Sequence, residues 1–184
     1  MRFDRHQFVD ECLDAGRGSA PAEAVRELVE RAVRAPTSLE DAFGHTMGFD
    51  GGILHHSAEM TIQYLVFPPG YRTGIHEHLL WAVIGPWSGF EDNDLYRVDE
   101  DGQLNQITSI RADTGHALVF EADAIHDAAA PLDTWSAALH VYGGALFDQP
   151  AREWVGIPPA AQPVDMDANF THYLDALAAA NLLS

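Results

Sequence analysis

The stretch GYRTGIHEHLLWAVIGPWSG, residues 70–89, carries two histidines one residue apart and a glycine at each end. The residues around His76 and His78 are typical of a β-strand, in which successive side chains point to opposite faces. Both imidazoles should therefore share one face, and Glu77 should point to the other. Two imidazoles one pleat apart can bind one metal ion, but the pair alone does not distinguish a metal site from ordinary strand histidines.

The sequence on both sides of this stretch predicts a mainly β domain. Between about residues 45 and 147, short runs rich in β-branched and aromatic residues alternate with Gly, Pro and Asp. Turn signals at this density favour an antiparallel sandwich or barrel, because a parallel sheet would need crossover helices that the sequence does not supply. The expected strands are residues 53–56, 60–67, 80–87, 95–98, 104–110, 117–120, 125–128 and 134–142.

Helices are expected on both sides of this region. Residues 1–44 show apolar residues at helical spacing, with one helix beginning near Pro21 and ending at Ala35, which precedes a proline. Residues 148–184 contain a loop at Pro158-Pro159 and an amphipathic helix over 167–183. The predicted organisation is a helical arm (1–44), a barrel with the candidate site (45–147) and a C-terminal loop and helix (148–184).

Composition excludes several classes of function. The 184 residues carry ten basic residues, all arginine, against 28 acidic ones, so the net charge is −18. Such a charge repels nucleic acids and anionic membrane surfaces. Cys12 is the single cysteine, so no internal disulfide is expected. The polar opening MRFDRHQ and the lack of a long apolar run predict neither a signal peptide nor a membrane span, and hence a cytoplasmic protein.

A second block, EADAIHD at residues 121–127, completes a resemblance to a known family. The spacing of Gly70, His76, His78 and Gly89, followed by Gly115 and His126, resembles the two metal motifs of the cupins. Cupins fold as double-stranded β-helix (jelly-roll) barrels, and the resemblance implies that His126 is a third metal ligand. Glu121, Asp123 and Ala130 depart from the second motif. The alternative is a cupin that has lost its metal and keeps the barrel as a scaffold.

The first motif departs from the family at one informative position. Ala82 stands where most cupins place a glutamate ligand, so three neutral imidazoles would hold the metal. Such a donor set suits Fe(II), our first expectation, and also Ni, Cu or Zn, better than Mg or Ca. Cupins with three histidine ligands include the cysteine dioxygenases, related thiol dioxygenases and the β-diketone-cleaving dioxygenases.

The segment AALHVY, residues 137–142, resembles the Ser-x-His-x-Tyr segment of the thiol dioxygenases. The resemblance implies that His140 and Tyr142 orient substrate and oxygen, and we predict them as catalytic residues; the alternative is a buried polar pair of the core. Ala138 replaces the serine, and Ala82 excludes the cysteine–tyrosine cross-link of the animal enzymes. HEHLLWAVIGPWSGFEDNDLYR, residues 76–97, and HVYGG, residues 140–144, also resemble uncharacterised bacterial cupins.

Substrate-binding residues are less well defined by the sequence. Cysteine dioxygenases bind the substrate carboxylate with an arginine on an early strand, but LHHS at residues 54–57 contains none. Arg72 and Arg97 could supply a guanidinium instead, and His56 and Trp81 are further candidates. Glu91, Asp92 and Asp94 are expected to form a solvated hairpin end.

These observations predict a mononuclear non-haem iron dioxygenase that oxidises a small thiol to a sulfinate. Its expected partners are that small molecule and O₂, in a chain that is a monomer or a homodimer. The alternatives are a three-histidine cupin of other chemistry, such as a diketone dioxygenase, and a non-catalytic module that binds a metal or a small ligand.

Overall fold

The structure is a computed structural model that describes residues 2–47 and 52–183. Met1, residues 48–51 and Ser184, which belong to the segments predicted from the sequence, lie outside the described residues. The helices are α1 (Arg5–Gly16), α2 (Pro21–Val33), α3 (Pro36–Phe43) and α4 (Met166–Ala179), with one 3₁₀ turn, η1 (Leu146–Asp148). The strands are β1 (Ile53–His56), β2 (Thr61–Phe67), β3 (Ile75–Glu77), β4 (Ala82–Ser88), β5 (Phe90–Val98), β6 (Leu104–Asp113), β7 (Leu118–Phe120), β8 (Ile125–Ala129), β9 (Ser136–Tyr142), β10 (Arg152–Val155) and β11 (Ala160–Pro163).

The strands form two antiparallel sheets, ordered β1-β2-β9-β4-β7 and β11-β10-β3-β8-β5-β6. Within them β2 pairs with β9, β3 with β8, β4 with β7 and β5 with β6. The chain is thus one long antiparallel ribbon that is folded back on itself and rolled into a barrel, which is the jelly-roll topology of the cupins. The mainly β fold with helices at both ends, as predicted from the sequence, is confirmed.

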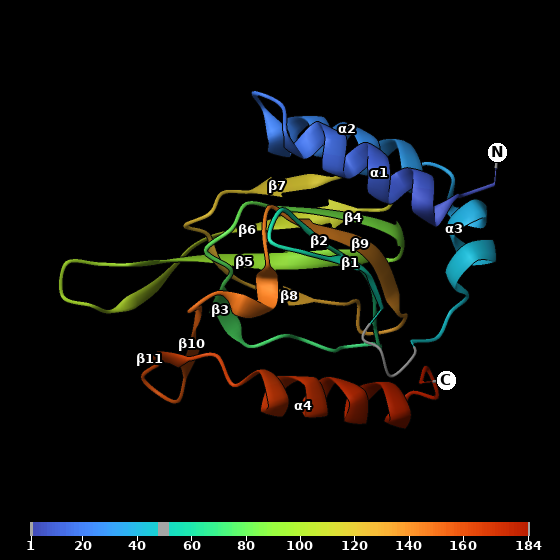
Figure 1. The fold of residues 1–184 in the computed structure, drawn as a ribbon. Helices are drawn as coiled ribbons and strands as arrows, with labels where there is room; N and C mark the ends of the chain where they lie inside the picture. The colour runs from blue at the N-terminus through green and yellow to red at the C-terminus, as the bar shows by residue number, and fades with distance from the viewer. Residues whose placement is uncertain (1, 48–51, 184) are drawn as a thin grey trace.

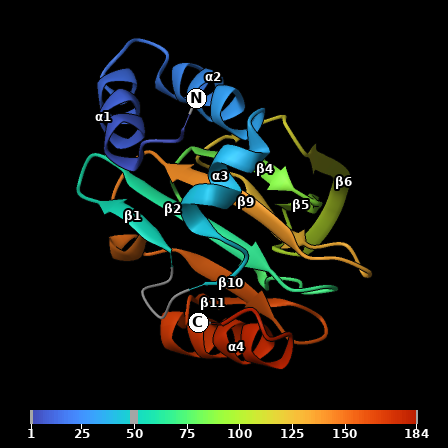
Figure 2. The same ribbon diagram turned by 90° about the vertical axis from the view of Figure 1, so that its right-hand side faces the viewer.

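Helices α1 to α3 cover the outer face of the first sheet (Figures 1 and 2). Asp4 caps α1 by accepting hydrogen bonds from two backbone amides, and Pro21 occupies the first turn of α2. The four-residue spacing of Val25, Val29 and Val33 gives α2 one buried face. Gly85 of β4 lets this face approach, because a Cβ at residue 85 would lie 2.5 Å from the side chain of Val29.

Alternation along β9 separates the two sides of the first sheet. Leu139 and Val141 pack into the main core under the helices, whereas Ala138 and Tyr142 pack into a second cluster inside the barrel. His140 shares the inner face with Ala138 and Tyr142 because residues two apart in a strand point the same way. The helices therefore bury one face of β9, and the polar residues His140 and Tyr142 on its other face point into the barrel.

The C-terminal segment closes the barrel on the side opposite α1 and α2 (Figure 1). Besides the expected helix, it contains the β10–β11 hairpin, which extends the second sheet by pairing Glu153 with His76 and Trp154 with Ile75. This hairpin was not predicted, because Pro158-Pro159 indicates only a loop in the sequence. The two prolines lie in the turn between β10 and β11. None of the described helices is long and apolar enough to cross a membrane.

Candidate metal centre

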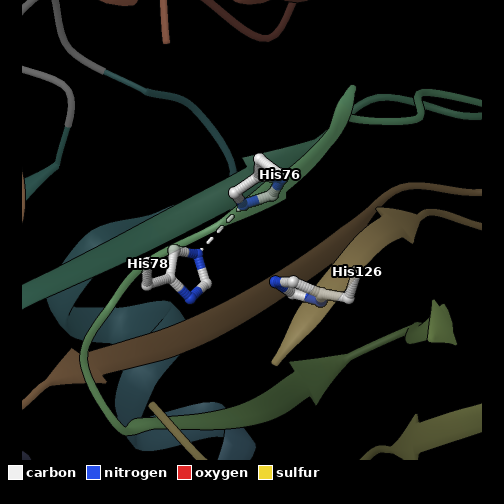
Figure 3. A group of neighbouring side chains, drawn as sticks. All are labelled: His76, His78 and His126. Atoms are coloured by element: carbon white, nitrogen blue, oxygen red, sulfur yellow. Dashed lines mark hydrogen bonds between the residues drawn. The ribbon is translucent and has the colours of Figure 1, made fainter. Parts of the chain in front are cut away.

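Three histidines, one on β3, one just after it and one on β8, converge inside the barrel (Figure 3). His76 on β3 and His126 on β8 are directly paired residues, and His78 follows β3 by one residue. Their ligand atoms all lie within 4.8 Å of one another. The Nε2 atoms of His76 and His78 are 3.0 Å apart, the separation of two nitrogens at right angles around a metal with bonds of about 2.1 Å. The structure thus brings together the three ligands predicted from the sequence.

Hydrogen bonds at the far side of two rings fix which nitrogen faces the centre. Nδ1 of His76 lies 2.8 Å from the carbonyl oxygen of Gly74, and Nδ1 of His126 lies 3.0 Å from Oδ1 of Asn93. The amide of Asn93 is itself oriented, because its Nδ2 donates to the carbonyl of Glu91. Each Nδ1–H therefore has an acceptor, which leaves both Nε2 lone pairs for a metal.

Burial favours the neutral form of all three rings. It lowers the pKa of His76 and lowers the pKa values of His78 and His126 well below the usual range, with repulsion between the rings acting in the same direction. Nε2 of His126 is buried and has no hydrogen-bond partner among the described residues. A buried polar atom of this kind normally has a partner, and a metal ion at the centre would supply it. The donor set and its geometry fit a metal.

His140 and Tyr142 lie next to the three histidines and are buried. Nδ1 of His140 is 3.2 Å from the hydroxyl of Tyr142, and the Tyr142 ring packs edge-on against His78 with 4.8 Å between the ring centroids. Burial and the charge of Glu91 raise the pKa of Tyr142, so its phenol is protonated at neutral pH. Neither residue belongs to the cluster of three ligands.

Glu91 is not at a solvated hairpin end, so the expectation for this residue was wrong. It lies on β5 of the second sheet, is fully buried, and places Oε1 3.4 Å from Nε2 of His140 on β9 of the first sheet. Asp92 and Asp94 point to the other face of the strand, where they bind Arg111 and Arg72. Strand alternation separates them: the inward series includes Glu91 and Asn93, and the outward series includes the two aspartates.

A cavity of about 640 Å³ opens from the three histidines toward the C-terminal segment. Its wall is largely apolar and aromatic, with contributions from β2, the β2–β3 loop, η1, β11 and α4. The aromatic residues are Phe67, Tyr71, Phe147, Phe170 and Tyr173. Tyr173 anchors α4 to the barrel, since its hydroxyl donates to the carbonyl of Val66 and accepts from the amide of that residue. The C-terminal segment is therefore one wall of the site.

The four residues predicted to bind substrate do not line this cavity. Arg72 bonds to Asp127 and Asp94, so its guanidinium is not free for a substrate carboxylate. Arg97 is exposed on β5. His56 is exposed and bonds to Thr61 at the edge of the first sheet. Trp81 packs against Gly143, where a Cβ would lie 2.1 Å from the indole.

Arg152 on β10 is the only arginine among the described residues of the cavity wall. Its guanidinium makes two hydrogen bonds to the Glu77 carboxylate, at 2.7 and 2.8 Å. Glu77 is thus held by Arg152 and is not directed at His76 and His78, as strand alternation predicts. The wall therefore offers no unpaired arginine to a ligand.

Sequence reasoning missed Glu91, Asn93 and Arg152 as residues of the site. For Glu91 and Asn93 a signal was available: both follow Gly89 in a strand at a spacing of two, with a charged residue between them. No comparable signal existed for Arg152, because its position depends on the β10–β11 hairpin pairing with β3.

No protein-family model matches the chain, and no curated protein matches it significantly. Solved structures match at low identity. A Bacillus halodurans protein is 14% identical over 58% of this chain and 77% of its own, with a TM-score of 0.49. The DMSP lyase of Ruegeria pomeroyi is 16% identical over 52% of this chain and 43% of its own, with a TM-score of 0.40.

An oxalate oxidase in complex with the substrate analogue glycolate is 15% identical over 47% of this chain and 43% of its own, with a TM-score of 0.40. The chain thus spans about half or less of the length of several of these solved proteins, at 43% for both the lyase and the oxidase. Similarity at this level does not indicate an activity.

Proposed function

We propose that the chain is a metal-dependent dioxygenase that oxidises a small thiol to a sulfinate. The observation that carries the proposal is the position of the hydrogen-bonded pair His140–Tyr142, whose phenol ring packs against His78 of the three-histidine cluster. A hydroxyl beside a metal centre can hydrogen-bond to a substrate held there. Polar groups are costly to bury, so their burial beside the ligands supports a role at the centre.

The donor set supports a first-row transition metal. Three neutral imidazoles with no carboxylate, two of them buried and that of His76 half-buried, favour Fe(II), and they would also accept Ni, Cu or Zn in the purified protein. Because the ligands carry no charge, the ion would keep its full positive charge and favour an anionic ligand such as a thiolate. Iron bound here would supply the redox chemistry that joins O₂ to sulfur.

The chain's own residues would position the reactants and exclude water. The overall reaction, R–S⁻ + O₂ → R–SO₂⁻, takes both oxygen atoms from O₂ and needs no other reductant. Tyr142 would accept a hydrogen bond from a donor group of the substrate, and His140 would hold the phenol in place. The apolar cavity wall would enclose the rest of the thiol. Arg152 is already bound to Glu77 and would not bind a substrate carboxylate.

The same cavity favours a second candidate, a dioxygenase that cleaves β-diketones. The enolate of a diketone chelates a metal with two oxygens and otherwise presents apolar groups. A largely apolar wall whose single arginine is already bound to Glu77 suits such a ligand. In this reading His140 and Tyr142 would line the space beside the chelated enolate.

Oxygen consumption by the protein loaded anaerobically with Fe(II) tests both candidates. Cysteine, cysteamine and 3-mercaptopropionate would be compared with acetylacetone, and mass spectrometry would follow the products. A thiol that takes up one O₂ and gains 32 Da supports the first proposal, and cleaved acetylacetone supports the second. Metal binding without oxygen uptake on any substrate would overturn both and leave a binding module. His126→Ala is the control that removes the metal.

A further inference from the structure

Glu91 makes a contact inside the barrel that the proposed chemistry does not explain. It projects from β5 of the second sheet, is 0% exposed and reaches His140 on β9 of the first sheet. Oε1 lies 3.4 Å from Nε2 of His140, and Oε2 has no hydrogen-bond partner among the described residues. A carboxyl group is costly to bury, so its retention needs a specific partner. Here that partner is His140.

His140 connects Glu91 to Tyr142. Its two ring nitrogens face different groups, Nε2 the carboxylate and Nδ1 the phenol at 3.2 Å. A neutral imidazole donates through one nitrogen and accepts through the other. An ionised carboxylate can only accept, whereas a phenol can do either. The direction of both hydrogen bonds is therefore decided at Glu91.

We propose that Glu91 is a positioning residue that places the single imidazole hydrogen of His140 on Nε2 and so makes the Tyr142 hydroxyl donate to Nδ1. With its hydrogen directed at His140, Tyr142 presents oxygen lone pairs to the cavity beside His78. The site then offers a hydrogen-bond acceptor next to the metal ligands. Ligands with a hydroxyl, thiol or N–H group near the metal are favoured over ligands that only accept.

The position of Ala138 shows why the acceptor comes from the opposite sheet. Ala138 shares the inner face of β9 with His140 but carries no polar group. The group that accepts a hydrogen bond from His140 is instead the Glu91 carboxylate on β5 of the other sheet. This role is independent of the substrate, so it holds for a thiol, a diketone or any other ligand of the centre.

The proton position on His140 can be measured directly. Two-bond ¹H–¹⁵N spectra of the Zn(II)-loaded, ¹⁵N-histidine-labelled protein distinguish Nε2–H from Nδ1–H, and His140→Gln assigns the signals. We expect Nε2–H in the unmodified protein. In Glu91→Leu the buried Nε2–H would have no acceptor, so the hydrogen should move to Nδ1, where Tyr142 can accept it. Glu91→Gln, which preserves the shape of the side chain, should also show an Nδ1–H population.

Asp92→Asn is the matched control, since Asp92 neighbours Glu91 but points outward to Arg111; it should leave the His140 signals unchanged. Nδ1–H in the unmodified protein would overturn the proposal. The proposal would also be overturned if His140 kept its hydrogen entirely on Nε2 in both Glu91→Leu and Glu91→Gln. The position of the His140 hydrogen in the unmodified protein tests the proposal even if neither Glu91 variant folds. The measurement uses the zinc-loaded protein, so it tests the proposal even if no oxygenase activity is found.

Turnover gives a second readout that a merely structural role would not produce. With a substrate identified as above, Glu91→Leu and Tyr142→Phe should each lower kcat at unchanged metal content. The double variant should be no slower than Tyr142→Phe, because Glu91 acts only through the phenol. Effects that multiply in the double variant would show that Glu91 acts by another route.

Discussion

Oδ1 of Asn93 lies 3.0 Å from Nδ1 of His126, and the amide that carries it is held by the backbone carbonyl of Glu91. This contact joins β5 to the ligand on β8. It fixes His126 with Nε2 toward the other two histidines, so the centre is preorganised before any metal binds.

Metal content depends on each of the three histidines. The purified protein should hold about one first-row metal per chain, and His76→Ala or His126→Ala should lose most of it, because the described residues offer no other ligand at this centre. Glu77→Gln is the neighbouring control and should keep its metal, since that carboxylate is bound to Arg152. Elemental analysis that finds full occupancy in the double variant His76→Ala/His126→Ala would exclude this centre.

Asn93→Ala should weaken metal binding without removing a ligand. Loss of the acceptor for Nδ1–H frees the His126 ring to rotate and to change tautomer. Contacts of this kind are worth about 10- to 100-fold in metal affinity, measurable by competition with a chromophoric chelator. Asn105→Ala, on the exposed strand β6, is the control. An unchanged affinity in Asn93→Ala would show that the contact does not orient the ligand.

Tyr142→Phe should leave metal content intact and lower turnover. The phenol lies beside the ligands but is not one of them. Loss of one positioned hydrogen-bonding group lowers rates by roughly 10- to 1000-fold. Unchanged turnover would remove the main reason for preferring a thiol dioxygenase. Intact mass adds a check: with Ala82 paired to Tyr142 across the strands, the protein should show no loss of hydrogen from a thioether.

The metal-free protein should lose stability as the pH falls from 7 to 5. The histidine pKa values are lowered in the folded state, so below about pH 6.5 the unfolded chain takes up protons that the folded chain does not. Each such proton lowers the free energy of unfolding by up to about 1.4 kcal/mol per pH unit. Urea unfolding with a chelator present measures this slope.

His78→Gln should give a shallower slope because it removes one of these groups. The lowered pKa values of Asp94, Asp99 and Glu153 act in the same direction but in a more acidic window, as their unfolded-state values lie near 4. An equal slope in His78→Gln between pH 5 and 7 would contradict the assignment to the buried histidines.

The local sequence was sufficient to predict the barrel and to predict which side chains of the site share a strand face. Short β runs with Gly, Pro and Asp between them require an antiparallel fold, and the alternation rule puts His76 and His78 on one face wherever the strand lies. The same rule places His140 with Tyr142. These statements depend only on the period of a strand, so the sequence alone was sufficient for them.

Pairing between distant segments decided the rest. Glu91 looks like part of an acidic hairpin in the sequence, and only the closing of β5 opposite β9 buries it against His140. Arg72 looks free in the sequence but lies against Asp127, 55 residues away. Arg152 and α4 become walls of the cavity because β10 pairs with β3. A local pattern fixes which way a side chain points along its own strand, but the group that it meets comes from a remote strand, and only the tertiary structure specifies that group.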